Sequence, residues 1–161
     1  MLLCALLSGL FFYHKGAQRK SQRHSKEINL DMSFTAKYTV GIGDINYGGH
    51  LGNDKALIIF HDARIQFLNN FGLTELNIGE SKGIIMVDAQ IKYLGQVSLH
   101  DELEVDINIE VENTKKFVVN YLVKNAKTHK DVISGTTGML CFDYTDQKVK
   151  QLPETFVNLF E

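Results

Sequence analysis

The residues best suited to chemistry in this sequence lie in one short segment, residues 41–54, which reads GIGDINYGGHLGND. Five of the chain's 13 glycines fall within it. Its polar side chains are Asp44, Asn46, His50, Asn53 and Asp54. Glycines allow sharp turns and let a ligand approach the backbone closely. Carboxylates and imidazoles transfer protons, and backbone N–H groups at a helix start stabilise negative charge. We therefore expect any active site to lie in this segment.

The spacing within this segment argues against three common binding sites. Neither the Gly-x-Gly-x-x-Gly spacing nor the Gly-Lys-Ser/Thr ending of a phosphate loop is present. A calcium loop that started at Asp44 would place Gly48 and Lys55 at ligand positions. A zinc site built on His50 and His61 lacks a third ligand. We expect neither a metal nor a cofactor.

Two elements must position this segment, a strand before it and a helix after it. Residues 33–42 alternate apolar and polar side chains, as a half-buried strand does. Residues 54–71 predict a helix of about five turns. Its apolar stripe consists of Ala56, Phe60, Ala63, Phe67 and Phe71. Other apolar residues widen the stripe, so we expect burial on most sides. Asn53 or Asp54 would cap the helix, and Gly72 would end it.

The remainder of the chain predicts a sheet of long strands. Strand patterns cover residues 84–94, 103–111, 117–123 and 132–144. Residues 153–160 predict a short terminal helix. The connections are short enough for antiparallel strands, and nothing else in the chain could bury the apolar helix. The sequence therefore predicts an α+β fold in which an antiparallel sheet of about five strands wraps round one long central helix, the hotdog fold.

The loop and the helix together resemble the 4-hydroxybenzoyl-CoA thioesterase-like branch of the hotdog acyl-CoA thioesterases, over residues 34 to about 156. That branch has the loop Asp-x-Asp-x-x-Gly-His-Val-Asn-Asn, then a helix with a Glu-x-Ala-Arg-like segment. Here the loop reads Asp44-Ile-Asn46-Tyr-Gly-Gly49-His50-Leu-Gly-Asn53, and the helix contains His61-Asp62-Ala63-Arg64. The resemblance implies hydrolysis of acyl-CoA to a free acid and CoA by a homodimer or homotetramer. Its sites would lie where one subunit's loop faces the neighbour's helix or strands.

One residue departs from the pattern of that branch. The usual catalytic carboxylate is the second Asp of the loop motif, where this sequence has Asn46. An amide cannot act as a general base or as a carboxylate nucleophile. Three possibilities stay open. Asp44 replaces it, or Asn46 positions a water while Asp62 or Asp54 acts as base, or the protein binds acyl-CoA or acyl carrier protein without hydrolysing it.

The expected site has two groups of residues. The catalytic candidates are Asp44, Asn46, His50 and Asp62. The substrate-binding candidates are Gly49, Gly52, Asn53 and Arg64. Plainer interpretations also exist: the glycine-rich segment could be an ordinary turn, and His61 and Asp62 could bond to each other or face a subunit contact. A related hotdog hydratase, which works at carbon rather than at the thioester, is a further alternative.

Composition sets the remaining expectations. A chain of 161 residues with 44% hydrophobic and 22% charged residues fits one globular domain. Its net charge of −2 gives no reason to expect nucleic acid as a partner. Two cysteines, Cys4 and Cys141, cannot form a disulfide framework and suit the reducing cytoplasm.

Residues 1–31 differ from the domain predicted over residues 32–161. The apolar run at residues 2–13 is shorter than the roughly 20 residues of a membrane-spanning helix. Its basic residues follow the run, whereas a secretory signal carries them before it. The tail could be a short membrane anchor, an atypical signal, or upstream sequence that is not native. We favour the last interpretation, because Met32 directly precedes the first strand pattern.

Overall fold

The computed structural model describes residues 34–160, so the interpretations of residues 1–31 lie outside the described residues. The elements in chain order are β1 (Phe34–Thr39), α1 (Ala56–Asn70), β2 (Gly83–Tyr93), β3 (Glu102–Val111), β4 (Lys116–Asn125), β5 (Asp131–Asp143), β6 (Lys148–Val149) and α2 (Glu154–Val157). Two short 3-10 helices, Ile42–Asp44 and Asn53–Lys55, lie at the two ends of the glycine-rich segment.

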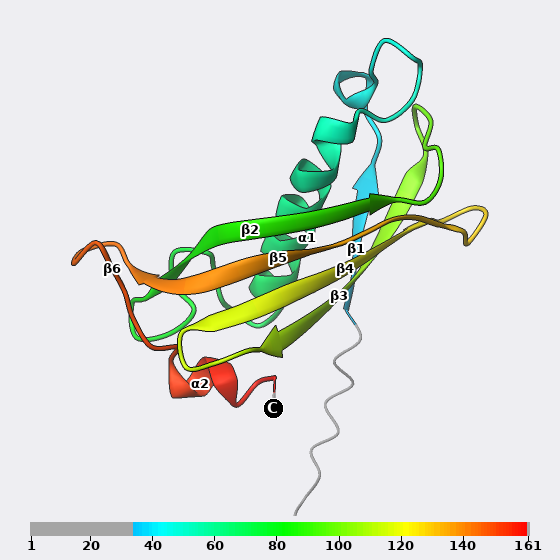
Figure 1. Ribbon diagram of the computed structural model, residues 1–161. Coiled ribbons are helices and arrows are strands. Elements are labelled where there is room, and N and C mark those ends of the chain that lie inside the picture. The colour runs from blue at the N-terminus through cyan, green and yellow to red at the C-terminus, as the bar shows by residue number, and fades with distance from the viewer. Residues whose placement is uncertain (1–33, 161) are drawn as a thin grey trace, which may run out of the picture. The chain divides into compact units, whose positions relative to one another are not determined.

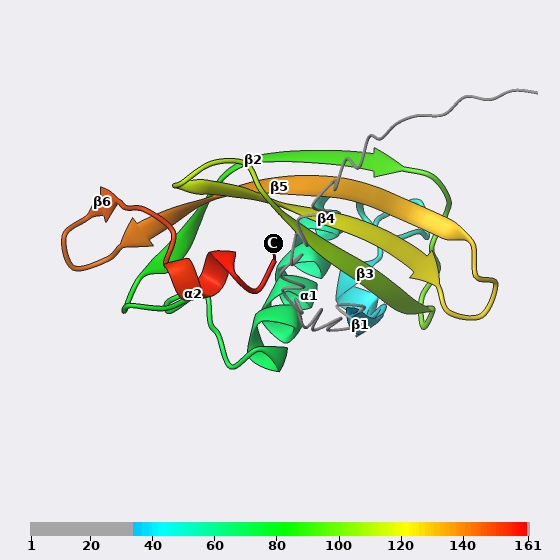
Figure 2. The same cartoon turned by 90° about the horizontal axis from the view of Figure 1, so that it is seen from below.

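The strands form one antiparallel sheet in the order β1-β3-β4-β5-β2, and the short β6 pairs with β5. β3, β4 and β5 follow one another through tight turns, as their sequence spacing predicts. The sheet curls round α1, which lies against its concave face (Figures 1 and 2). This arrangement confirms the predicted hotdog fold of about five strands round one helix.

The core lies between α1 and the inward-facing side chains of the sheet. The helix contributes Ile59, Phe60, Ala63, Phe67 and Leu68, all buried. β4 contributes every second residue, Phe117, Val119, Tyr121 and Val123. The rings of Phe60 and Tyr121 stack with centroids 4.2 Å apart. A β-carbon at Gly135 would lie 2.7 Å from the Phe60 ring, so only glycine lets β5 approach the helix this closely.

Two details of the predicted helix are wrong. Neither Asn53 nor Asp54 caps it with a side chain, because a 3-10 turn over these residues leads directly into α1. The helix is also not buried on most sides, since Leu57, Ile58 and Ile65 are exposed. Its end is confirmed: α1 stops at Asn70, and Gly72 follows with a φ of 69°.

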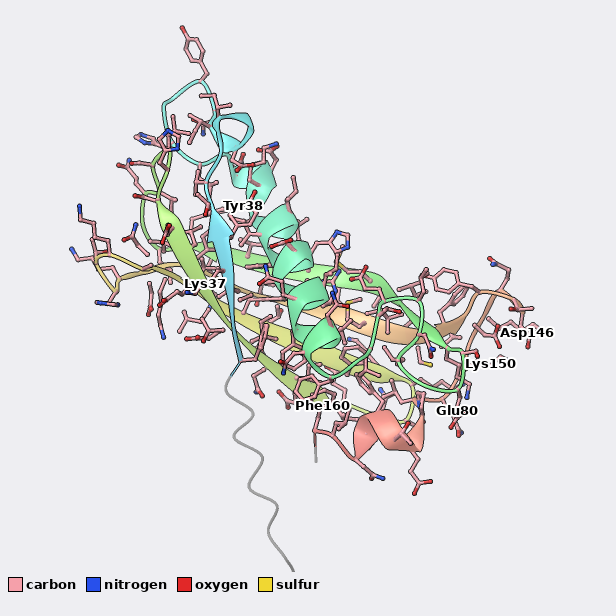
Figure 3. All side chains as sticks on the ribbon, turned by 180° about the vertical axis from the view of Figure 1, so that it is seen from behind. Lys37, Tyr38, Glu80, Asp146, Lys150 and Phe160 are labelled. Carbon is pink, nitrogen blue, oxygen red and sulfur yellow. The ribbon has the colours of Figure 1, made fainter. Side chains whose placement is uncertain are left out.

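The two edges of the sheet differ in how they are covered. At the β1 edge, the side chain of Gln66 from α1 donates to the carbonyl oxygen of Lys37 (3.0 Å) and accepts from its N–H (3.3 Å). Figure 3 shows Lys37 and Tyr38 on β1 beside the helix. At the β2 edge, no strand within residues 34–160 pairs with the outer side of β2. Met86, which is 47% exposed, lies there beside a bulge between residues 86 and 88.

Candidate active site

The glycine-rich segment folds into a tight turn that Asn46 holds in place. The N–H of Asn46 donates to the carbonyl oxygen of His50 (2.8 Å), and its carbonyl oxygen accepts from Gly49, whose φ is 78°. Its side-chain oxygen accepts from the N–H of Gly48 (2.8 Å) and of His50 (3.4 Å). This is an Asx-type turn, in which the side chain satisfies the backbone. The side-chain oxygen of Asn46 therefore shapes the loop.

Asp44 ties this loop to β1. Its Oδ2 accepts from the hydroxyl of Tyr38 (3.0 Å) and from the N–H of Gly41 (2.9 Å). Burial, then the hydrogen bond to Asp44, and then the charges of Asp44 and Asp62 raise the pKa of Tyr38 to about 12. The Tyr38 hydroxyl thus keeps its proton over the physiological range and continues to donate to Asp44.

The start of the helix directs its backbone N–H groups at the loop. Gly52 is not available as a donor, because its N–H bonds to the carbonyl oxygen of Asp44 (2.8 Å). The next two N–H groups, those of Asn53 and Asp54, belong to the first turn, where no intrahelical partner exists. The hydroxyl of Tyr93 donates to the carbonyl oxygen of Asn53 (2.6 Å) and fixes this turn against the end of β2.

A cavity of about 220 Å³ lies beside this turn. Its lining includes Asn46, His50 and Asn53 from the loop and the helix start, and Tyr93 and Gln96 from the end of β2 and the segment after it. The structure therefore brings together three of the residues that the sequence predicted for the site. Gly49 and Gly52 shape the surrounding loop.

The two carboxylates of the helix region lie elsewhere. Asp62 accepts from the side-chain amide of Gln66 (2.7 Å), on the face of α1 that covers β1. It does not bond to His61, so that interpretation is wrong. Asp54 is exposed and lies 3.5 Å from Lys55 Nζ. Neither Asp44 nor Asp62 lines the cavity at His50.

A larger cavity, of about 450 Å³, lies between α1, β2 and β5. Its apolar walls include Leu57, Ile58, Ile84, Met86 and Met139, and its polar lining consists of His61, Arg64, Glu75, Thr137 and Tyr144. An open pocket with apolar walls and converging polar groups suits a small-molecule site.

The polar groups of this cavity form a connected chain. Arg64, only 6% exposed, donates from Nε to Glu75 Oε1 (2.7 Å) and from Nη1 to the Tyr121 hydroxyl (3.0 Å). That hydroxyl lies 3.0 Å from Thr137 Oγ1. Glu75 Oε2 lies 2.9 Å from Nε2 of His61. Arg64 thus bonds both to the core, through Tyr121, and to the cavity wall, through Glu75.

Within this series of hydrogen-bonded side chains, Arg64 and Tyr121 shift the pKa of each other. Burial alone would lower the pKa of Arg64, but Tyr121 and Glu75 outweigh it and raise that pKa. For Tyr121 burial acts in the opposite direction and raises the pKa of the hydroxyl, although Arg64 opposes this shift. Arg64 is therefore a guanidinium cation, and Tyr121 is a neutral hydroxyl.

Sequence reasoning missed Glu75. It lies in the connection between α1 and β2, where no periodic pattern marks it. One signal was present: His61 and Arg64, three residues apart, share one helix face and carry only hydrogen-bond donors when protonated. Such a face needs an acidic partner, and the following connection supplies one.

Comparisons with known proteins give a family and a fold. Residues 40–160 match the family described as the thioesterase-like superfamily. A 1,4-dihydroxy-2-naphthoyl-CoA thioesterase from Synechocystis has a similar structure (TM-score 0.72, 21% identity, 80% of this chain and 95% of that chain covered). So does a Staphylococcus aureus protein solved in complex with CoA (0.68, 20%, 78% and 80%). A gentisyl-coenzyme A thioesterase is similar as well (0.70, 18%, 80% and 100%).

At these identities the structural matches establish the fold, and the family match supports thioester hydrolysis in general terms. A search of curated proteins finds no significant match. Among the helices of residues 34–160, none has the length and hydropathy to cross a membrane. The same residues contain no cluster of His, Cys, Asp and Glu side chains suited to a metal ion.

Proposed function

Because this chain belongs to the thioesterase-like superfamily, we propose that it hydrolyses an acyl-CoA thioester to a free acid and CoA, at a site completed by a second copy of the chain. The observation that carries the proposal is the cavity at the start of α1, where Asn46, His50 and Asn53 converge. The CoA bound to the S. aureus neighbour supports acyl-CoA as the ligand class.

The start of α1 supplies the electrostatic part of this reaction. Attack of water on a thioester places negative charge on the former carbonyl oxygen. The backbone N–H groups of Asn53 and Asp54, aided by the helix dipole, are donors for that oxygen. The bond from Gly52 to Asp44 holds the turn rigid, and Tyr93 fixes it from the other side. Loss of one such donor typically costs about 3–4 kcal/mol of transition-state stabilisation.

His50 and Asn46 occupy the wall of the same cavity and would orient the substrate. Among the predicted bases, Asp44 is bonded to Tyr38 and Gly41, and Asp62 to Gln66. Both stay predictions, which Asp44→Ala and Asp62→Ala variants test. If neither variant lowers turnover by at least about tenfold, neither residue is the base.

The outer edge of β2 supports a homodimer, alone or within a homotetramer. Unpaired strand edges readily pair with another chain. Beside this edge, Leu57, Ile58 and Met86 expose apolar surface, and all three line the larger cavity. A second copy seated on β2 would cover this surface and close the cavity. The loop of one copy would then face the helix of the other.

Release of free thiol from a panel of short, long and aromatic acyl-CoAs tests the proposed hydrolysis. We expect turnover with at least one of them and a dimer or tetramer by sedimentation. The engaged carboxylates of Asp44 and Asp62 favour one second candidate, a module that binds acyl-CoA without cleaving it. That module would raise its melting temperature with acyl-CoA but release no thiol above background.

A further inference from the structure

The proposed hydrolysis needs a group that takes a proton from the attacking water. The usual position in the loop holds Asn46, whose amide cannot accept that proton. The larger cavity contains a different pair of titratable groups, His61 on α1 and Glu75 in the connection that follows it. Neither takes part in the loop turn or in the oxyanion donors.

We propose that His61 is the general base of the hydrolysis and that Glu75 is its positioning residue, held in turn by Arg64. This inference rests on the proposed hydrolysis and deepens it, because it names the group that activates the water. Three features carry it: the exposure of His61 in the cavity, the orientation of its ring, and the anchoring of Glu75 in the core.

The first feature is access. The His61 side chain is 53% exposed and lines the cavity of about 450 Å³, next to Leu57 and Ile58. Arg64, on the same helix face, is buried behind it. A buried arginine needs one acidic partner, and Glu75 satisfies that need through Oε1. The second oxygen of Glu75 is directed at a half-exposed imidazole, which the needs of Arg64 do not explain.

The second feature is the tautomer. Glu75 Oε1 accepts from the Arg64 guanidinium, and a carboxylate in such an ion pair only accepts hydrogen bonds. Nε2 of neutral His61, 2.9 Å from Glu75 Oε2, therefore carries the proton. Nδ1 then holds the lone pair that a water proton requires. A carboxylate that orients an imidazole in this way is a recurring arrangement in acyl-transfer sites.

The third feature is rigidity. Glu75 is held by Arg64, which is held by Tyr121, which contacts Thr137 of β5. The ring of Tyr121 also stacks on Phe60 of α1. Hydrogen bonds thus connect the proposed base to the centre of the sheet. A base held by packed groups loses little entropy when it reaches the transition state.

The distance along α1 decides how this base meets the oxyanion donors. His61 lies about 12 Å beyond Asn53 along the helix axis, at about 1.5 Å per residue. The attacking water and the carbonyl oxygen lie within a few ångströms of each other, so one chain cannot supply both groups to one thioester. A second copy on the open β2 edge can, with the donors of one chain facing His61 of the other.

The reaction balances with these groups. His61 Nδ1 takes a proton from water as the water oxygen bonds to the thioester carbon. The carbonyl electrons move to the oxygen, which the helix N–H groups stabilise. The tetrahedral intermediate then collapses, the carbon–sulfur bond breaks, and the CoA thiolate leaves. The imidazolium returns its proton to that thiolate, and the products are the free acid and CoA.

The test uses the full chain and the acyl-CoA that wild type cleaves fastest. We expect His61→Ala to lower kcat by about 100-fold or more with little change in KM. Added imidazole should restore at least about tenfold of that loss, because a small base refills the space. Glu75→Gln should lower kcat, because the tautomer of His61 is no longer fixed. Added imidazole should not rescue this variant, because His61 still occupies the space. His129→Asn, at an exposed histidine in the β4–β5 turn, is the matched control and should keep the wild-type rate.

The outcomes separate the two proposals. If wild type releases no thiol from any acyl-CoA, the proposed hydrolysis fails and this inference fails with it. If wild type is active and His61→Ala keeps more than about a third of its kcat, His61 is not the base, while hydrolysis stands. A loss that imidazole does not restore and that comes with a lower melting temperature means a structural role, and it overturns the inference. A large loss in Glu75→Gln with none in His61→Ala would make Glu75 itself the base.

Discussion

The two edges of the sheet are built for opposite purposes. At β1, the amide of Gln66 imitates a neighbouring strand and bonds to both backbone groups of Lys37. At β2, no strand within residues 34–160 pairs with the outer side; Glu75 and Tyr144 bond to the backbone of Ile84 at its start, and apolar side chains of β2 and α1 lie beside the rest. Uncovered strand edges promote association, and proteins usually block those that should stay apart. One edge is thus covered within the chain, and the other is the edge to which the proposed second copy would bind.

The helix carries the same division. Its face toward β1 presents Asp62 and Gln66, whose polar groups bond within the subunit. Its face toward β2 presents Ile58, His61 and Arg64, which line the larger cavity. Polar groups on the face toward β1, the closed side, stabilise the fold. Those on the face toward β2, the open side, surround a space that a ligand and a partner could enter. The experiments below separate these two roles, beginning with the open side.

The largest effect should come from Arg64→Met. Methionine fills much of the volume but removes the guanidinium that bonds to both Glu75 and Tyr121. The pair is partly buried, with the Arg64 side chain 7% and the Glu75 side chain 26% exposed, and we expect its removal to cost about 3 kcal/mol in the free energy of unfolding, measured in urea. Lys124→Met removes the surface pair with Asp106, 2.6 Å apart, and should cost less than about 1 kcal/mol. Equal losses in the two variants would mean that the Arg64 pair is no more than a surface contact.

Next in size is the effect of Ile58→Asp on assembly. Ile58 is 48% exposed beside the β2 edge, so aspartate should fold normally but place a charge in the contact between copies. We expect a monomer by sedimentation and a fall in kcat/KM of about 100-fold, because the donors and the base no longer meet. Asn108→Asp adds the same charge at an exposed position of β3, which β4 and β5 separate from β2, and should change neither quantity. An active monomer of Ile58→Asp would contradict the shared site.

The sequence was sufficient to predict the fold, but not the difference between the β1 side and the β2 side of the molecule. The period-2 pattern of β4 and the helical stripe through Phe60 and Phe67 follow directly from burial, so sheet and helix were predictable. The exposure of Ile58 was not, because an apolar residue reads the same whether it faces its own core or a second copy. Local spacing was enough to predict that Asn46, His50 and Asn53 lie together, and they line one cavity. Glu75 was missed because only the fold brings it to His61 and Arg64.

On the closed side, Gln66→Ala should uncover the β1 edge. The variant loses both bonds to Lys37 and the bond to Asp62. These are largely exposed, so we expect a loss of about 1 kcal/mol in urea unfolding. Sedimentation at high concentration should also show weak association beyond the wild-type oligomer. Asn69→Ala, an exposed position on the same helix, controls for helix propensity and should cause neither change. Unchanged sedimentation would show that other contacts protect this edge.

The smallest effect is the pH dependence of the Tyr38–Asp44 hydrogen bond, which ties the loop to β1. Burial, the hydrogen bond to Asp44 and the charges of Asp44 and Asp62 raise the pKa of Tyr38 from 10.0 to about 12. Because the folded pKa lies above the unfolded one, the stability from this group is complete below pH 10 and is lost as the pH rises towards 12. Allowing for solvent around the partly exposed ring, we expect a loss of about 1 kcal/mol. Tyr38→Phe should lack this component, so the difference between its urea stability and that of wild type should shrink across this range. A difference that stays constant with pH would mean that the Tyr38–Asp44 bond does not hold the loop to β1, and that the closed side depends on Gln66 alone.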